Sequence, residues 1–157
     1  MDPLWIALAA TVLLGLAALA WWSRGRPVRL LARRHAAAEQ FRAQRSELAA
    51  AFLAAAGATG KPRGLRWIAC RLDPAVLFAA DRKTGELYAL VGATISFEAV
   101  EGGGMEEVEA VGNLRYATAV FAHRDGAWTT DGRAVFNLEP AQAIQRFGDA
   151  LEPLPGV

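Results

Sequence analysis

The most regular alternation of apolar and polar residues runs from Leu87 to Val100. Every odd-numbered position of this stretch is apolar, namely Leu87, Ala89, Val91, Ala93, Ile95, Phe97 and Ala99. A period of two predicts a β-strand with one buried face, because successive side chains of a strand point to opposite sides. The glycines at 102–104 then predict a turn. We therefore expect this strand to belong to an antiparallel sheet.

Two further strands are expected after that turn. The first runs from about Glu106 to His123, and the second ends near Leu138 after a hairpin turn at Arg124-Asp125-Gly126. Keeping the apolar residues on one face sets the register of both pairs. It places Phe97 opposite Val108, Ile95 opposite Ala110, Val91 opposite Leu114, Ala122 by Trp128, Tyr116 by Ala134 and Leu114 by Phe136. A slip of one residue would turn every side chain to the other face.

The sheet is expected to begin before Leu87. A strand at 75–80 precedes the turn at 81–85, and a fifth strand at 65–72 precedes a corner at Asp73-Pro74. Gly92, Gly112 and Gly132 fall inside the expected strands, where glycine marks bulges or bends. The sheet should therefore curl.

Helices are expected to cover one face of this sheet. Pro140 suits the first turn of a helix that continues until Pro153, with Ala141, Ile144, Phe147, Gly148 and Leu151 on one side. The predicted fold class is α+β, a curved antiparallel meander of four or five strands covered by helices. This order of elements resembles, in outline, cystatin-like and NTF2-like domains. The resemblance implies a fold and no activity.

The first uncharged run of the chain predicts a transmembrane helix. It extends from Leu4 to Trp22 over about 19 residues, which spans roughly 28 Å as a helix. The arginines that follow predict that the C-terminal side stays in the cytoplasm, by the positive-inside rule. Two alternatives remain open, a signal peptide cleaved after Ala18-Leu19-Ala20 and a buried core helix.

Residues 24–57 are rich in strong helix formers and predict a long helical stalk. Its distal residues Phe41, Leu48 and Phe52 can dock on the following domain. A simple spacer and a coiled-coil dimer are alternatives. The predicted organisation is therefore a transmembrane anchor at 1–23, a basic stalk at 24–57 and an α+β domain at 58–157.

The net charge of +1 hides an asymmetry along the chain. Residues 1–57 hold seven Arg and three acidic residues, a balance of +4, so the remainder carries −3. A nucleic-acid partner is not expected, because the positive charge lies beside the apolar run and not on the folded domain. Anionic lipid headgroups are the expected partner of Arg24, Arg26, Arg29, Arg33 and Arg34.

No residue of the sequence is assigned as catalytic, cofactor-binding or metal-ligating. His123 beside Arg124-Asp125 could act as a base, but no nucleophile stands at a matching spacing. The acidic residues around the glycine turn could hold Ca²⁺, yet they lack the spacing of a known calcium loop; they are Glu98, Glu101, Glu106, Glu107 and Glu109. The single cysteine, Cys70, excludes an internal disulfide.

The remaining candidates form a surface or a pocket. Arg115 and Arg133 are expected on the outer sheet face, where they and His123 could meet a protein partner. The concave face could instead leave a small-ligand pocket lined by Tyr116, Trp128 and Phe136.

These features favour a membrane-tethered, non-enzymatic interaction or scaffold domain on the cytoplasmic face of the membrane. The alternative is a small-ligand-binding or hydrolytic domain with a pocket between the curved sheet and the helices. A third hypothesis is that the protein is an accessory subunit of a membrane complex.

Overall fold

The structure is a computed structural model that describes residues 3–59, 61–105, 107–108 and 112–157, and for residues 3–10 and 16–27 the backbone alone. Within this part of the chain there are three helices and six strands. The fold is α+β with a curved antiparallel sheet, which confirms the predicted class.

Two helices occupy the first part of the chain. Helix α1 runs from Pro3 to Ala43 and helix α2 from Arg45 to Ala58, with a break at Gln44. Strong helix formers fill the stretch after Pro27, so the helix predicted for residues 24–57 is confirmed apart from that break.

The chain divides into two compact units, one ending at Ala36 and the other running from Ala37 to Val157. The second unit therefore contains the end of α1 and all of α2. Among the residues that the structure describes, no helix is both long enough and apolar enough to cross a bilayer. The predicted anchor at 1–23 has no support from the structure, and most of its side chains lie outside the described residues.

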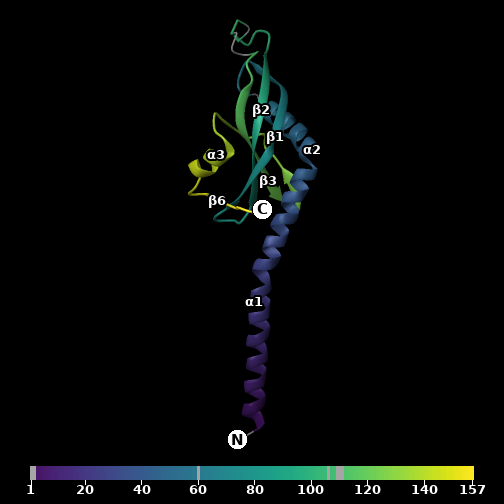
Figure 1. The fold of residues 1–157 in the computed structure, drawn as a ribbon, viewed down its shortest axis with the longest axis vertical. Coiled ribbons are helices and arrows are strands. Elements are labelled where there is room, and N and C mark those ends of the chain that lie inside the picture. The colour runs from purple at the N-terminus through teal and green to yellow at the C-terminus, as the bar shows by residue number, and fades with distance from the viewer. Residues whose placement is uncertain (1–2, 60, 106, 109–111) are drawn as a thin grey trace. The chain divides into compact units, whose positions relative to one another are not determined.

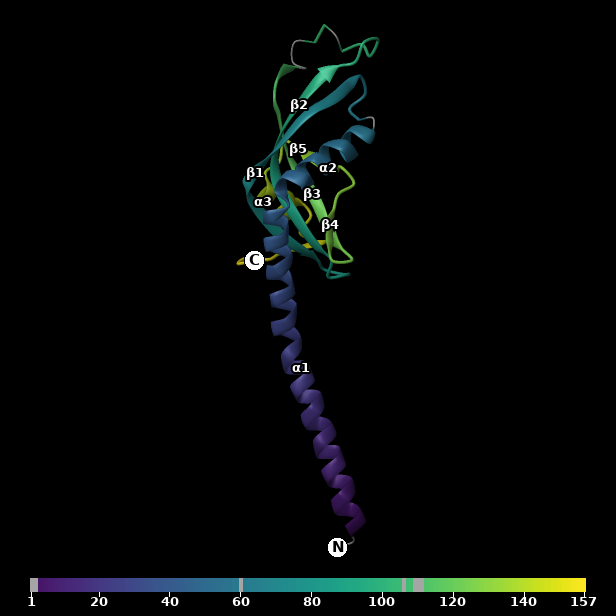
Figure 2. The same ribbon diagram turned by 90° about the vertical axis from the view of Figure 1, so that its right-hand side faces the viewer.

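The sheet is a meander with short strands at both edges. Its strands are β1 (Leu65–Asp81), β2 (Leu87–Ala99), β3 (Arg115–Arg124), β4 (Ala127–Thr129), β5 (Ala134–Phe136) and β6 (Leu151–Pro153). They follow the order β4-β3-β2-β1-β6, and β5 also pairs with β3; β4 and β5 are labelled in Figure 2.

The first and last strands differ from the prediction. The two strands expected at 65–72 and 75–80 form the single strand β1, and the expected corner at Asp73-Pro74 is a register shift between Leu72 and Val76. The helix expected to reach Pro153 ends earlier, since α3 runs from Pro140 to Arg146. Residues Leu151–Pro153 instead pair with β1 as strand β6.

The predicted register between β2 and β3 is wrong by five residues. Val91 pairs with Ala119 and Ile95 with Arg115, not with Leu114 and Ala110. Strand β2 ends at Ala99 and β3 starts only at Arg115, so pairing does not resume directly after the glycines at 102–104. Because five is an odd number, the other face of β3 enters the core. Val108 lies in the loop, and Ala110 falls outside the described residues.

The hairpin turn at Asp125-Gly126 is confirmed, while the register beyond it is wrong. Both turn residues have positive φ, 51° and 82°, as a two-residue hairpin turn requires. The pairs found in β4 and β5 differ from the predicted ones by one or three residues. They are Ala122 with Thr129, His123 with Trp128, Ala117 with Phe136 and Ala119 with Ala134.

Helices lie on both faces of the sheet, with α2 and α3 on opposite sides in Figure 1. The end of α1 and α2 bury Phe41 and Phe52 against the odd-numbered side chains of β2 and β3, a surface that we call the core face. Phe41 makes edge-to-face ring contacts with Phe121 and Trp128 at centroid distances of 5.2 and 5.1 Å. The docking predicted for Phe41, Leu48 and Phe52 is thus confirmed.

The opposite surface, which we call the α3 face, carries the even-numbered side chains of β2 and β3. Helix α3 covers only part of it, where Ala143 and Ile144 pack on Ala79 and Leu90. This short helix starts with a reciprocal cap in which the Gln142 side chain accepts a hydrogen bond from the Glu139 N–H at 2.9 Å. Beside the helix, the α3 face is hollowed around Tyr88, Val120 and Arg133.

Candidate functional site

Two of the residues expected to form an aromatic pocket lie on the core face and one on the α3 face. Trp128 pairs with His123 and is buried, and its indole N–H donates to the Ala37 carbonyl at 2.8 Å. Phe136 lies beside Trp67, with ring centroids 6.2 Å apart. Tyr116 points to the other side of the sheet, where its hydroxyl lies 3.4 Å from Asp73 Oδ2. The structure does not bring the three together.

The other surface candidates are also separated. His123 lies 3.3 Å from Gln40 Oε1 and packs edge-on against Trp128, which places it beside α1. Arg115 pairs with Ile95 on the core face, whereas the backbone of Arg133 bonds to Val120. Of these residues, Arg133 is the one that borders a hollow on the α3 face.

The arginines expected at lipid headgroups lie in the unit that ends at Ala36. Arg29 and Arg33 are exposed and Arg34 is partly exposed. The side chains of Arg24 and Arg26 fall outside the described residues.

Among the residues that the structure describes, no three His, Cys, Asp or Glu side chains are grouped as a metal site would need. Glu106 and Glu109 of the acidic cluster lie outside them. Cys70 is half-buried, and this burial raises the pKa of its thiol to about 11. A thiol with so high a pKa is a poor nucleophile at neutral pH.

The open part of the α3 face holds two adjoining pockets, which together we call the Arg133 trough. The first has a volume of about 280 Å³ and a mostly polar lining that includes Arg124, Thr129, Thr130 and Asp131. The second has about 170 Å³ and a mostly apolar lining that includes Leu90, Val135, Phe147 and Leu151. Both pockets share Tyr88, Val120 and Arg133. The trough thus has a polar end and an apolar end.

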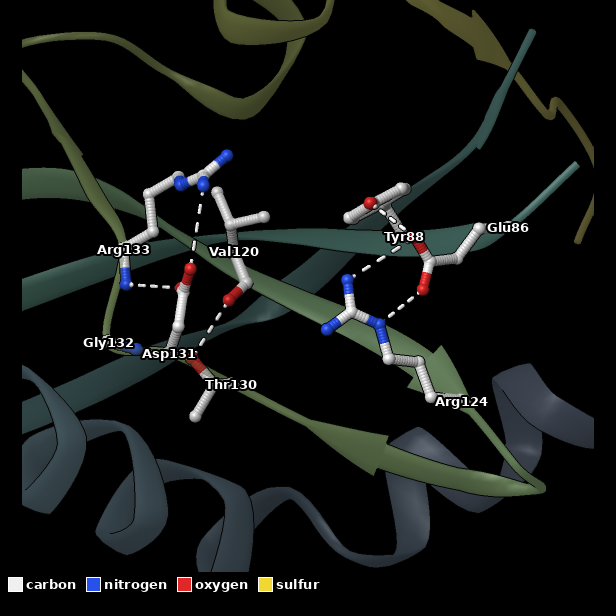
Figure 3. A network of polar contacts seen from close by, with 8 residues as sticks. All are labelled: Glu86, Tyr88, Val120, Arg124, Thr130, Asp131, Gly132 and Arg133. Atoms are coloured by element: carbon white, nitrogen blue, oxygen red, sulfur yellow. Dashed lines mark hydrogen bonds and ion pairs between the residues drawn. The ribbon is translucent and has the colours of Figure 1, made fainter. Parts of the chain in front are cut away.

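One wall of the polar end is an ionic network from neighbouring strands, shown in Figure 3. Arg124 donates its Nε–H to Glu86 Oε1, and its Nη2 lies 3.4 Å from Glu86 Oε2. The Tyr88 hydroxyl donates to the same Oε2 at 2.6 Å. The hydrogen bonds from Arg124 and then Tyr88 lower the pKa of Glu86. The same bond to Glu86, together with burial, raises the pKa of Tyr88.

The opposite wall is the segment 130–133, which the backbone of Val120 holds in place. The Val120 N–H donates to the Arg133 carbonyl at 3.1 Å, and the Val120 carbonyl accepts the Thr130 hydroxyl at 3.0 Å. Gly132 has a positive φ of 77°, and a Cβ there would collide with the backbone of Ala56 in α2. The main chain of Arg133 is therefore fixed from both sides of the sheet.

The Arg133 side chain itself is loosely held. Its Nη2 lies 3.5 Å from Asp131 Oδ2, and both side chains are about two-thirds exposed, at 67% and 68%. An exposed ion pair at that distance contributes little free energy, typically about 0–1 kcal/mol. The guanidinium is thus available to another anion.

Sequence reasoning missed Glu86 and Tyr88 because they became neighbours of Arg124 only in the true register. Leu87 pairs with His123, which sets Glu86 beside Arg124 across the strand pair. An opposite-charge pair across two strands is a register signal in its own right. Weighing it against the apolar pattern could have selected the pairing that the structure shows.

Comparison of the chain with protein-family models, curated proteins and solved structures gave no match.

Proposed function

We propose that this protein is a non-enzymatic binding module that its N-terminal segment tethers to the cytoplasmic face of the membrane. The observation that supports binding is the Arg133 trough, where two ion pairs flank the apolar side chain of Val120 on an open face of the sheet (Figure 3). Arg124 and Glu86 are held by each other, and the backbone of Arg133 is held by Val120, while the Arg133 side chain is available to another anion. Such an arrangement is suited to recognising a partner rather than to activating a nucleophile.

The tether rests on the sequence. The uncharged run from Leu4 to Trp22 has the length of a bilayer crossing, and five arginines follow it within twelve residues, as the printed sequence shows. Each arginine near an anionic leaflet adds about 1 kcal/mol to membrane attachment. The expected partners are therefore anionic lipid headgroups at the N-terminal side and a protein or small ligand at the folded unit.

Deletion of residues 1–22 tests the tether. The full chain should sediment with membranes and resist a carbonate wash, whereas the deletion variant should be released into the soluble fraction. A C-terminal epitope should be protected from protease added outside intact cells. A deletion variant that stays in the membrane fraction, or an epitope cleaved from outside, would contradict the tether.

The arginines are tested on vesicles with the variant that lacks residues 1–22. Replacing Arg24, Arg26, Arg29, Arg33 and Arg34 by Gln should abolish its salt-sensitive binding to vesicles of anionic lipid. A control variant in which the exposed Arg63 and Arg146 are replaced by Gln should bind normally. Equal binding of the two variants would exclude lipid recognition by these five arginines.

A small-ligand-binding domain is the second candidate function. The polar pocket of the trough, about 280 Å³, comes close to the lower end of the usual range of about 300–1,000 Å³ for ligand sites, and the adjoining apolar pocket adds about 170 Å³. A ligand that occupied both would be small.

A further inference from the structure

The two ends of the Arg133 trough differ in chemistry, and the difference restricts what can occupy it. Leu90, Val120 and Val135 line the apolar pocket from the sheet, and Phe147 lines it from the segment after α3. The side chain of Phe147 is 44% exposed, so its ring offers apolar surface that no described part of the chain covers completely. A ligand that filled this pocket would gain free energy by removing this surface from water.

Of the two arginines that line the trough, Arg133 has the weaker ion pair. Arg124 contacts both carboxylate oxygens of Glu86, and this pairing raises the pKa of Arg124. The guanidinium of Arg133 has one ion pair with the described residues, the 3.5 Å contact with Asp131, and lines both pockets. A carboxylate bound there would exchange a long, exposed ion pair for a charge-assisted hydrogen bond.

The acidic residues in and beside the trough accept more hydrogen bonds from the protein than the Arg133 guanidinium donates. Glu86 accepts hydrogen bonds from Arg124 and Tyr88. Asp81, which borders the apolar pocket, accepts the N–H groups of Lys83 and Thr84 through Oδ1, both at 2.8 Å. Asp131 accepts the Arg133 N–H at 3.1 Å and, within the trough, lines the polar pocket and not the apolar one. An anion whose apolar part enters the second pocket would therefore meet Arg133 first.

We infer that the Arg133 trough binds a small apolar acid, with its carboxylate on the Arg133 guanidinium and its hydrocarbon part against Val120, Val135 and Phe147. This inference rests on ligand binding, the second of the two proposed functions, and does not depend on the tether. The fixed backbone of Arg133 places the guanidinium at the junction of the two pockets. The site therefore recognises the combination of charge and apolar bulk.

The test uses the full chain in phosphatidylcholine nanodiscs with labelled Val, Leu and Ile methyl groups. 2-Naphthoate is titrated as the acid and 2-naphthalenemethanol as its neutral counterpart, with empty nanodiscs as the background. The methyl resonances of Val120 and Val135 should shift with the acid, while those of Val91, buried on the core face, should not. Weaker binding of the alcohol, by about tenfold, is expected from the loss of one charge-assisted hydrogen bond.

Two variants separate the contributions. Arg133→Gln should weaken binding of the acid by about tenfold and leave binding of the alcohol unchanged. Arg63→Gln, on the exposed surface away from the trough, should change the affinity for neither ligand. Phe147→Ala should weaken the binding of both ligands, because it removes an apolar contact and no charge.

The outcomes distinguish the inference from the function on which it rests. If acid and alcohol bind equally well to the wild type and to Arg133→Gln, ligand binding stands and the recognition of an acid is overturned. If neither ligand shifts Val120 or Val135, or if Val91 shifts instead, the trough is not a ligand site and both fail.

Discussion

The indole N–H of Trp128 donates a hydrogen bond to the carbonyl oxygen of Ala37 at 2.8 Å. Ala37 is the first residue of the folded unit, and Trp128 belongs to the short strand β4 at the edge of the sheet. A single buried bond therefore joins two segments separated by 91 residues.

The variant Trp128→Phe should be less stable than the wild type by about 1–3 kcal/mol, because it removes the buried donor and leaves a small void. Pulse proteolysis in urea measures the loss in the full chain. Trp67→Phe is the matched control, since the Trp67 indole also donates to a carbonyl, that of Lys61 at 2.7 Å, but at a more exposed position. An equal loss in both variants would contradict a special role for the bond to Ala37.

Gly132→Ala should destabilise the protein far more than Gly126→Ala. Both glycines have positive φ, so both variants pay about 1–2 kcal/mol for a left-handed alanine. A Cβ at Gly126 meets nothing within 4 Å, whereas one at Gly132 collides with the backbone of Ala56. The additional loss at Gly132 should reach about 2 kcal/mol or more. Equal unfolding free energies of the two variants would mean that α2 does not approach Gly132.

Both tyrosines of the chain should ionise above the ordinary pKa of about 10, in a titration followed by phenolate absorbance. The pKa of Tyr88 is raised by its bond to Glu86, and that of Tyr116 by burial and then by Asp73. The stability linked to these phenols is present below pH 10 and is lost as the pH rises through the raised values.

Two variants assign the tyrosine titrations. Glu86→Gln should lower the pKa of Tyr88 alone, and Asp73→Asn that of Tyr116 alone, so each acts as the control of the other. A wild type with both phenols at the ordinary value would contradict the network drawn in Figure 3 and the contact between Asp73 and Tyr116.

Cys70 should react slowly with thiol reagents in the native protein and quickly in urea. Burial raises its pKa from the usual value of 9.0 to about 11, so the reactive thiolate is scarce at neutral pH. Its linked stability is complete below pH 9.0 and falls as the pH approaches 11. Reaction at the same rate in the native and unfolded chains would show that the thiol is exposed. Cys70→Ala confirms that this thiol is the one measured.

The sequence predicted β2 well and β3 poorly, because the prediction of a strand's buried face depends on how clearly its apolar and polar residues alternate. On β2 every odd-numbered residue is apolar and Leu87 to Phe97 of this set are buried as predicted, although the even-numbered Leu90 and Gly92 are buried as well. On β3 the stretch 116–122 has apolar side chains on both sides, so the pattern fits either face. Assuming a tight turn at 101–104 then selected the wrong one, and the exposed Leu114 was assigned to the core.

Strand β6 and the Arg133 trough lay beyond what local patterns can reveal. Leu151–Pro153 is a strand because its backbone meets β1, not because its three side chains alternate. The trough forms where residues from β2, β3 and the segment 130–133 meet, and the wrong register kept Glu86 and Arg124 apart. Arg133 was identified as a candidate, but the tight packing of Gly132 that fixes its backbone was not.

Strand β2 is covered on both of its faces along its first half and on one face beyond it. From Leu87 to Ala93 every residue except Tyr88 is buried, while from Thr94 to Glu98 burial alternates. Saturation mutagenesis should therefore show two regimes within one strand. Polar replacements would be rejected at almost every position of the first half, and at every second position of the next. A sheet strand thus changes its tolerance to sequence variation beyond Ala93, because α3 packs on Leu90 and the side chains of Asp73 and Tyr116 close over Gly92, whereas the even-numbered residues that follow are partly or fully exposed.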